Sequence, residues 1–130
     1  MTNYIDGFVH PVPRIYLEDY KKVAEKVAEI WKAYGALSYT EFVGDDLWLE
    51  GVKSFADAVD AKDDEAILFG WVVFPSKEIR DSANIKVAAD PRMEKLVSPL
   101  TNPKRLIFDA SRMVYAGFLP LVHSKVELEE

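Results

Sequence analysis

Two carboxylates, Asp6 and Glu41, stand where alternating side chains predict strands rather than loops. A carboxylate carried into an apolar interior is costly unless it is paired or hydrogen-bonded. Left unpaired, it becomes a candidate general acid or base for a small ligand. Paired with a cation such as Arg112, or turned to water at a sheet edge, it is only structural. Asp6 and Glu41 are therefore the candidate catalytic residues, and the sequence leaves these roles open.

Three aromatic residues and one arginine are the candidate ligand-binding residues. Tyr39, Trp71 and Tyr115 combine ring surfaces with polar tips, and Arg112 offers a forked set of donors. Such residues could hold an aromatic or oxygenated small molecule. Aromatic residues at strand spacing also serve as core or interface residues, so a purely structural interpretation competes with this one.

Other reactive groups do not form known motifs. The two histidines, His10 and His123, lack metal-binding spacing, and there is no cysteine. The acidic turn 44–46 with Glu50 does not match a calcium loop. No G-x-S-x-G elbow and no phosphate-binding glycine loop occurs. We expect no metal site and no cofactor.

The elements that position these residues alternate between strands and helices. Alternation predicts strands at 4–10 and 37–43, and a continuous apolar run at 66–74 predicts a central strand. Apolar residues three and four apart predict an amphipathic helix over 16–34 that carries Trp31 into the core. The stretch 47–65, with Trp48, lacks a clear period and is interpreted as a surface connection that holds a short strand or turn.

The second half repeats the alternation of helix and strand. Ser76 is positioned to cap a second helix, which Asp90 and Pro91 interrupt before one or two further turns. A last strand is expected over 112–118. The order β-α-β-β-α-β predicts an α+β, ferredoxin-like fold with two helices on one face of an antiparallel sheet. Residues 1–122 form the predicted domain, and 123–130 form an acidic tail that we expect to be mobile.

Composition narrows the class of partner. The 130 residues are 49% hydrophobic and carry a net charge of −6. Nine acidic residues and two lysines fall between positions 41 and 65, and no basic stripe is present. Nucleic acid is therefore an unfavourable partner. No apolar run is long enough to cross a bilayer, and no signal peptide is evident. We expect a cytoplasmic protein.

The face of the sheet that the helices leave open is predicted to be apolar. We assign Tyr4, Asp6 and Phe8 to this face by alternation, together with either Phe69 and Trp71 or the intervening residues of the third strand. An apolar patch of that size needs a cover. A second copy of the chain is the economical one, which predicts a homodimer.

Several short motifs, in order along nearly the whole chain, resemble the YbaA-like family of small uncharacterised bacterial proteins. They are Tyr4–Val9 with Val12-Pro13, Gly44–Asp46, Phe69–Trp71, Asp90–Arg92, and Phe108–Met113 with Gly117-Phe118. The resemblance implies the dimeric α+β barrel superfamily, which includes cofactor-free monooxygenases, decarboxylases and small-molecule binders. Ala116 stands where this family usually has a glycine. Any role of that position that needs a close approach of the backbone is therefore not carried over to this chain.

Two hypotheses of function remain. The first is a protein that binds a small organic molecule without catalysis. The second is a cofactor-independent enzyme, similar to the monooxygenases or decarboxylases of the superfamily, in which Asp6 or Glu41 accepts a proton and Tyr39 or Arg112 orients the substrate. The sequence does not decide whether the protein is an enzyme.

Overall fold

Residues 3–127 are described by a computed structural model of the chain. Four strands form one antiparallel sheet in the order β2-β3-β1-β4. Their bounds are β1 Tyr4–Pro13, β2 Ser38–Val43, β3 Glu65–Phe74 and β4 Val114–Phe118. This is the strand order of the ferredoxin-like plan, so the predicted fold class is confirmed.

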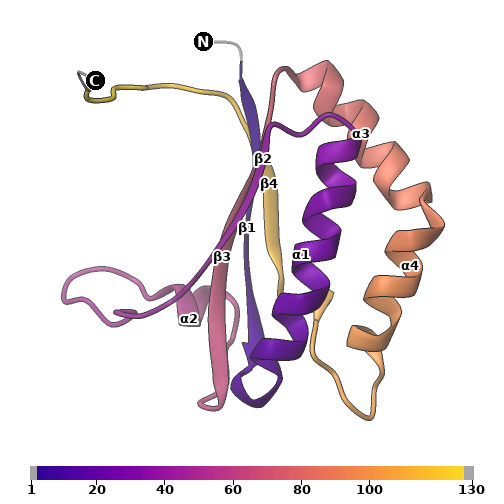
Figure 1. Cartoon of the computed structure of the whole chain (residues 1–130). Coiled ribbons are helices and arrows are strands. Elements are labelled where there is room, and N and C mark those ends of the chain that lie inside the picture. Colours follow the sequence, from indigo (N-terminus) through magenta and orange to yellow (C-terminus); the bar gives the residue numbers. More distant parts are fainter. Residues whose placement is uncertain (1–2, 128–130) are drawn as a thin grey trace.

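Three helices cover one face of the sheet (Figure 1). They are α1 Leu17–Ala33, α3 Lys77–Ala89 and α4 Pro91–Val97. Short 3-10 turns occupy Arg14–Tyr16, Ser98–Thr101 and Ala110–Arg112. The four-residue helix α2, Phe55–Ala58, lies on the opposite side of the sheet within the connection between β2 and β3.

The predicted helix boundaries follow from local side-chain bonds. The Ser76 hydroxyl accepts a hydrogen bond from the backbone N–H of Ile79 at 3.2 Å and caps α3, as expected. Asp90 ends α3 and caps α4 through the N–H of Arg92 at 2.8 Å. Gly35, with φ of 114°, follows α1 in the left-handed conformation that glycine adopts without strain.

Strand β1 is three residues longer than predicted, because Pro11 and Pro13 do not end it. Strand β4 pairs with β1 only over Ile5–Val9, whereas β3 pairs with it through Pro13. One side of β1 is therefore unpaired around the two prolines, where a missing N–H is tolerated. Strand β4 begins at Val114 rather than Arg112, since Arg112 lies in a 3-10 turn capped by Asp109.

The two faces of β1 are the reverse of those predicted, whereas on β3 Phe69 and Trp71 lie on the outer face, which was one of the two alternatives. Tyr4, Asp6, Phe8 and His10 face the helices and are buried. The alternation of β1 was correct, but alternation defines two sets of side chains without saying which set meets the helices. Asp6 is accommodated on this side because it pairs with Arg80 of α3, and His10 contacts the Tyr20 hydroxyl through Nε2.

The core between the sheet and the helices has two parts. One contains Phe8, Val72, Phe74 and Ala83, with Trp31 packed against it. The other contains Val12, Tyr20, Leu68, Leu100 and Ile107. The predicted contrast between Trp31 and Trp48 is confirmed, since Trp31 packs edge-on against Phe74 while Trp48 is 68% exposed.

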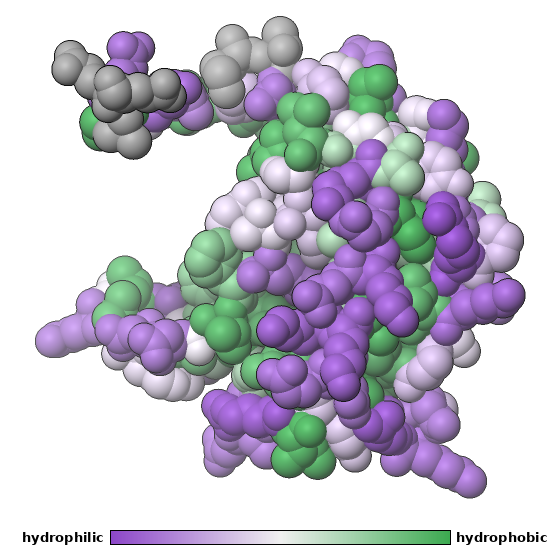
Figure 2. All heavy atoms as spheres, viewed as in Figure 1, coloured by the Kyte–Doolittle hydropathy of each residue, from purple (hydrophilic) through white to green (hydrophobic). Residues whose placement is uncertain are grey.

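The outer face of the sheet is apolar and only partly covered. Figure 2 shows a concave surface with hydrophobic residues between the β2–β3 connection and the C-terminal segment. Its exposed side chains include Phe42, Phe69, Val114 and Phe118. The C-terminal segment has no helix or strand over 119–127, and the rest of the predicted tail, 128–130, lies outside the described residues. Within the described part of the chain, no helix is long and apolar enough to cross a membrane.

Candidate functional site

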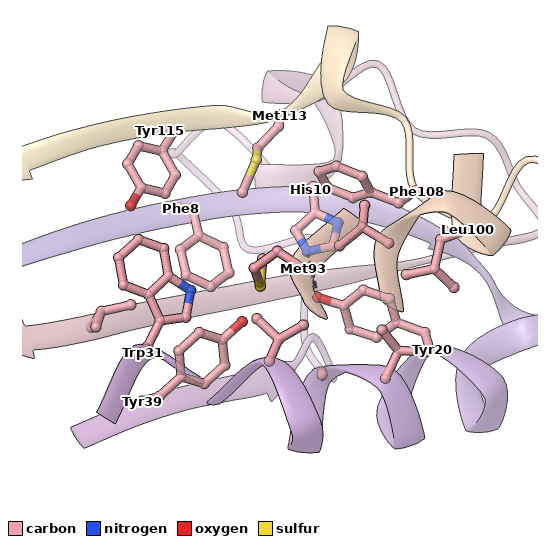
Figure 3. Close-up of a pocket in the computed structure, with 15 residues that line it drawn as sticks. Phe8, His10, Tyr20, Trp31, Tyr39, Met93, Leu100, Phe108, Met113 and Tyr115 are labelled. Atoms are coloured by element: carbon pink, nitrogen blue, oxygen red, sulfur yellow. Dashed lines mark hydrogen bonds between the residues drawn. The ribbon is translucent and has the colours of Figure 1, made fainter. Parts of the chain in front are cut away.

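A cavity of about 280 Å³ lies between the sheet and its helices. Side chains from all four strands, from α1 and α4 and from the connection that follows α4 point toward one another around it (Figure 3). Its lining residues are Phe8, His10, Tyr20, Val23, Ala24, Val27, Trp31, Tyr39, Val72, Met93, Val97, Leu100, Phe108, Met113 and Tyr115. The walls are aliphatic, aromatic or thioether surfaces, and the polar groups come from His10, the three tyrosines and the Trp31 indole.

A chain of polar contacts runs along one wall of the cavity. His10 Nε2 lies 3.1 Å from the Tyr20 hydroxyl oxygen (Figure 3). That hydroxyl donates to Glu41 Oε1 at 2.6 Å, and the Tyr39 hydroxyl donates to Glu41 Oε2 at 2.8 Å. Both oxygens of the Glu41 carboxylate are therefore engaged by tyrosines.

The protonation states of this chain follow from burial and charge. Burial alone would raise the pKa of Glu41, but the hydrogen bonds from Tyr20 and Tyr39 and the nearby His10 ring, whose Nε2 lies 3.6 Å from Glu41 Oε1, outweigh it and hold the pKa of that carboxyl below its usual value. Burial and the neighbouring Glu41 carboxylate raise the pKa of both tyrosines above the ordinary value. Glu41 is therefore an anion, and both tyrosines keep their protons.

A second ionic cluster touches the cavity through Tyr115. The Tyr115 hydroxyl donates to Asp6 Oδ2 at 2.5 Å, and Arg80 Nε donates to Asp6 Oδ1 at 2.8 Å. Burial and the hydrogen bond to Asp6 raise the pKa of Tyr115. Asp6 is fully buried, and its cation is Arg80 rather than the predicted Arg112. Its two oxygens are thus committed to structural partners.

Arg112 is held away from the cavity by other carboxylates. Its guanidinium donates two parallel 2.7 Å hydrogen bonds to Glu65 and one of 2.8 Å to Asp109. Its hydrogen bonds to Glu65 hold the pKa of Glu65 below the ordinary value. Arg112 therefore joins β3 to the turn before β4, and it is not among the cavity lining.

A more open groove of about 470 Å³ lies between α1 and β2. Tyr20, Ala24 and Tyr39 line both this groove and the cavity, whereas Glu41 lines only the groove. The two tyrosines and Glu41 therefore form a polar partition between the cavity and the groove.

Of the predicted site residues, the structure brings some together and separates others. Tyr39 and Tyr115 line the cavity, and Glu41 and Asp6 each bind one of them from behind. Trp71 lies on the outer face of the sheet, stacked on Phe42 at 5.5 Å between ring centroids. Among the described residues, no group of three or more His, Asp or Glu side chains is arranged to hold a metal ion.

Residues 3–109 match the model of a family described as "Protein of unknown function (DUF1428)". The chain belongs to this family. It is 38% identical over 119 residues to the uncharacterized protein YbaA of Escherichia coli, a match that covers 92% of this chain and 97% of that protein. The uncharacterized protein YbaA of Shigella flexneri matches with the same identity and coverage. The resemblance noted in the sequence is thereby confirmed.

Solved structures of low sequence identity share the fold. SnoaB, a cofactor-independent oxygenase from Streptomyces nogalater, gives a TM-score of 0.56 at 12% identity, covering 95% of this chain and 97% of that one. A nipsnap family protein of unknown function from Agrobacterium tumefaciens also gives 0.56, at 16% identity and with coverage of 95% and 92%. Rv0793 from Mycobacterium tuberculosis gives 0.55, at 11% identity and with coverage of 95% and 100%. These likenesses establish an α+β barrel type of fold.

Three residues important to the site were missed by sequence reasoning. His10 was considered only as a metal ligand, and neither Tyr20, which falls within the helix predicted over 16–34, nor Arg80 was singled out. The signal for His10 was its alternation with Phe8 and Asp6, which places all three on one face. Arg80 is 74 residues from Asp6 in the chain, and no local pattern indicates that contact.

Proposed function

We propose that the protein binds a small organic molecule in the cavity between the sheet and the helices. The observation that carries the proposal is an apolar space of about 280 Å³ with a few convergent polar groups. Small-molecule sites have this character, with apolar walls for affinity and a few fixed polar atoms for orientation. The volume suits a molecule of one or two rings.

The proposal is tested by native mass spectrometry of the purified protein, followed by extraction of any bound metabolite. A stoichiometric mass increment that is lost on denaturation supports it. Val97→Phe, which narrows the cavity, should lower the occupancy at least about tenfold. Ile85→Phe makes a similar change on α3 at a side chain that is 73% exposed, and should leave the occupancy unchanged. Equal occupancy in both variants contradicts the proposal.

The alternative is a cofactor-independent enzyme, either monooxygenase-like or decarboxylase-like. Two observations favour it. SnoaB, which has a similar fold, is described as a cofactor-independent oxygenase. The Glu41 carboxylate is hydrogen-bonded to Tyr20 and Tyr39, which both line the cavity. In this hypothesis Glu41 is the proton acceptor, and Asp6 is the weaker candidate because Arg80 pairs with it. Turnover of the extracted metabolite, lost in Glu41→Gln, supports catalysis, whereas unchanged metabolite supports binding alone.

The chain is proposed to act as a homodimer through the outer face of the sheet. Phe42, Phe69, Val114 and Phe118 are each between 43% and 59% exposed on this face. A hollow of about 390 Å³ beside Phe69, Val114 and Phe118 is lined almost entirely by apolar side chains. A stable dimer buries about 800 Å² per protomer, and packing sheet on sheet would cover this surface.

Light scattering at micromolar concentration tests the dimer. The expected mass is twice the 14.8 kDa of the chain. Phe69→Lys places a charge in the apolar face and should give the monomer mass, while the control Ile85→Lys, on α3, should stay dimeric. A monomeric wild-type protein contradicts this part of the proposal.

Three further expectations belong with the proposal. A cytoplasmic location fits a chain without cysteine. Residues 1–122 are taken as the folded unit and 123–130 as an acidic tail. Limited proteolysis that removes the tail and leaves the rest intact would support this division.

A further inference from the structure

The proton of the Tyr20 hydroxyl determines which nitrogen of His10 carries a proton. A tyrosine has one hydroxyl proton, and Tyr20 donates it to the Glu41 carboxylate at 2.6 Å. The Tyr20 oxygen can then only accept from His10 Nε2, 3.1 Å away. Nε2 must therefore carry a hydrogen, and a neutral His10 presents a bare lone pair at Nδ1.

His10 Nδ1 is a buried polar atom without a partner. The residue is 1% exposed, its ring lines the cavity, and Nδ1 has no hydrogen bond to any described residue. Leaving a buried acceptor unsatisfied is unfavourable, and such atoms in native proteins call for an explanation. A ligand that supplies a donor would satisfy it.

We propose that His10 Nδ1 is the polar recognition point of the cavity and accepts a hydrogen bond from the hydroxyl of a neutral phenol-type ligand. This inference rests on the proposed function, since it concerns the same cavity. The hydroxyl group supplies the missing donor, and the aromatic ring packs against the walls of the cavity. Phe8, Phe108, Met93 and Met113 offer ring and thioether surfaces suited to a flat aromatic molecule.

Charge around the cavity favours a neutral ligand. Arg80 and Arg112 are paired with Asp6 and Glu65. Neither lines the cavity, so no cation there would compensate a carboxylate or phosphate ligand. The Glu41 oxygens already accept from two tyrosines, which leaves no free anion for an ammonium group.

Naphthol and its methyl ether are the probes that test this inference. They share a two-ring skeleton, but only naphthol has a hydroxyl to donate. Calorimetric titration of the wild-type protein should show naphthol binding about three- to tenfold more tightly, the gain expected from one buried hydrogen bond. Equal affinity overturns the role of His10 while leaving the cavity as a binding site. No binding of either probe counts instead against the proposed function.

Two substitutions at His10 separate the roles of its two nitrogens. A glutamine amide reaches about as far as Nε2 and an asparagine amide about as far as Nδ1. His10→Gln should keep the bond to Tyr20 and lose the preference for naphthol, whereas His10→Asn should keep the preference. Binding of the methyl ether should change less than about twofold in both. His123→Gln, at an exposed position, is the control and should match the wild type.

Nitrogen NMR of the wild-type protein keeps the inference testable if the variants fail to fold. The expected free state has a protonated Nε2 and an unprotonated Nδ1. Naphthol should shift the Nδ1 resonance toward its hydrogen-bonded position, and the methyl ether should not. A proton on Nδ1 of the free neutral ring, or an Nδ1 resonance that does not respond to naphthol, overturns the proposal.

Discussion

Tyr20 on α1 donates its hydroxyl proton to Glu41 on β2 across 2.6 Å, and this bond ties the helical layer to an edge strand of the sheet. The same tyrosine contacts His10 on β1. A single hydroxyl thus connects three elements at the wall of the cavity. The charge of Glu41 is what makes the arrangement stable, because a charged acceptor forms the stronger hydrogen bonds.

Glu41→Gln should destabilise the protein at neutral pH by about 1 to 3 kcal/mol. His10, Tyr20 and Tyr39 hold the pKa of Glu41 below its ordinary value of 4.5. The stabilisation is therefore complete above pH of about 4.5 and is lost as the pH falls through the lower folded-state pKa. Urea unfolding at several pH values should show that the unfolding free energies of the wild type and Glu41→Gln converge at acid pH. Glu29→Gln, at a side chain that is 70% exposed, should cause little change, and a pH-independent difference for Glu41→Gln would contradict the account.

Arg112→Ala should destabilise the protein by about 3 kcal/mol, because it leaves the buried Glu65 carboxylate without its bidentate partner. Arg105→Ala removes an exposed ion pair with Asp19 and should cost less than about 1 kcal/mol. Chemical unfolding of both variants measures the contrast. Should Arg112→Ala keep full stability but lose ligand affinity, the earlier hypothesis of a ligand-binding arginine would stand instead.

Asp6→Asn should destabilise the protein by about 3 kcal/mol, because Arg80 would lose its buried anion. Asp81 also pairs with Arg80 but is 44% exposed, so Asp81→Asn should have a much smaller effect. Thermal unfolding compares the two variants. Adding Arg80→Met to Asp6→Asn should recover part of the loss. Unchanged stability of Asp6→Asn would show that this pair is not a structural anchor.

Gly117→Ala should destabilise the protein by about 1 to 3 kcal/mol through overpacking. A Cβ at this position would lie 2.3 Å from the Tyr4 hydroxyl oxygen and 2.8 Å from an Arg80 guanidinium nitrogen. The Tyr4 ring also lies beneath the Arg80 cation, so neither neighbour moves freely. Differential scanning calorimetry measures the loss, and Tyr4→Phe in the same chain should reduce it. No difference between Gly117→Ala and the wild type would argue against this close packing.

Local patterns predicted the elements because each carries its own signal. Alternation marks the strands, and the Ser76 hydroxyl and the Asp90-Pro91 pair mark helix ends through bonds within a few residues. The side of β1 that meets the helices depends on contacts such as Asp6 with Arg80, 74 residues away. That choice is made by tertiary structure, and so the two faces were exchanged in the prediction.

The candidate site was only partly predictable for the same reason. Tyr39 and Tyr115 were chosen for their chemistry, and both line the cavity. Trp71 and Arg112 were chosen on the same grounds, but one lies on the outer face and the other binds Glu65. Residue type indicates which chemistry a side chain can perform. Which side chains lie next to it is determined by distant parts of the chain.

The location of the binding site is the central claim, and a titration with naphthol followed by NMR tests it most directly. Met93 and Met113 line the cavity, and Trp71 lies on the opposite face of the sheet. In protein with labelled methionine methyl groups and indole nitrogens, the Met93 and Met113 signals should shift together and saturate, while the Trp71 signal should stay in place. A shift of Trp71 with unmoved methionine signals would place the ligand on the outer face and contradict the account.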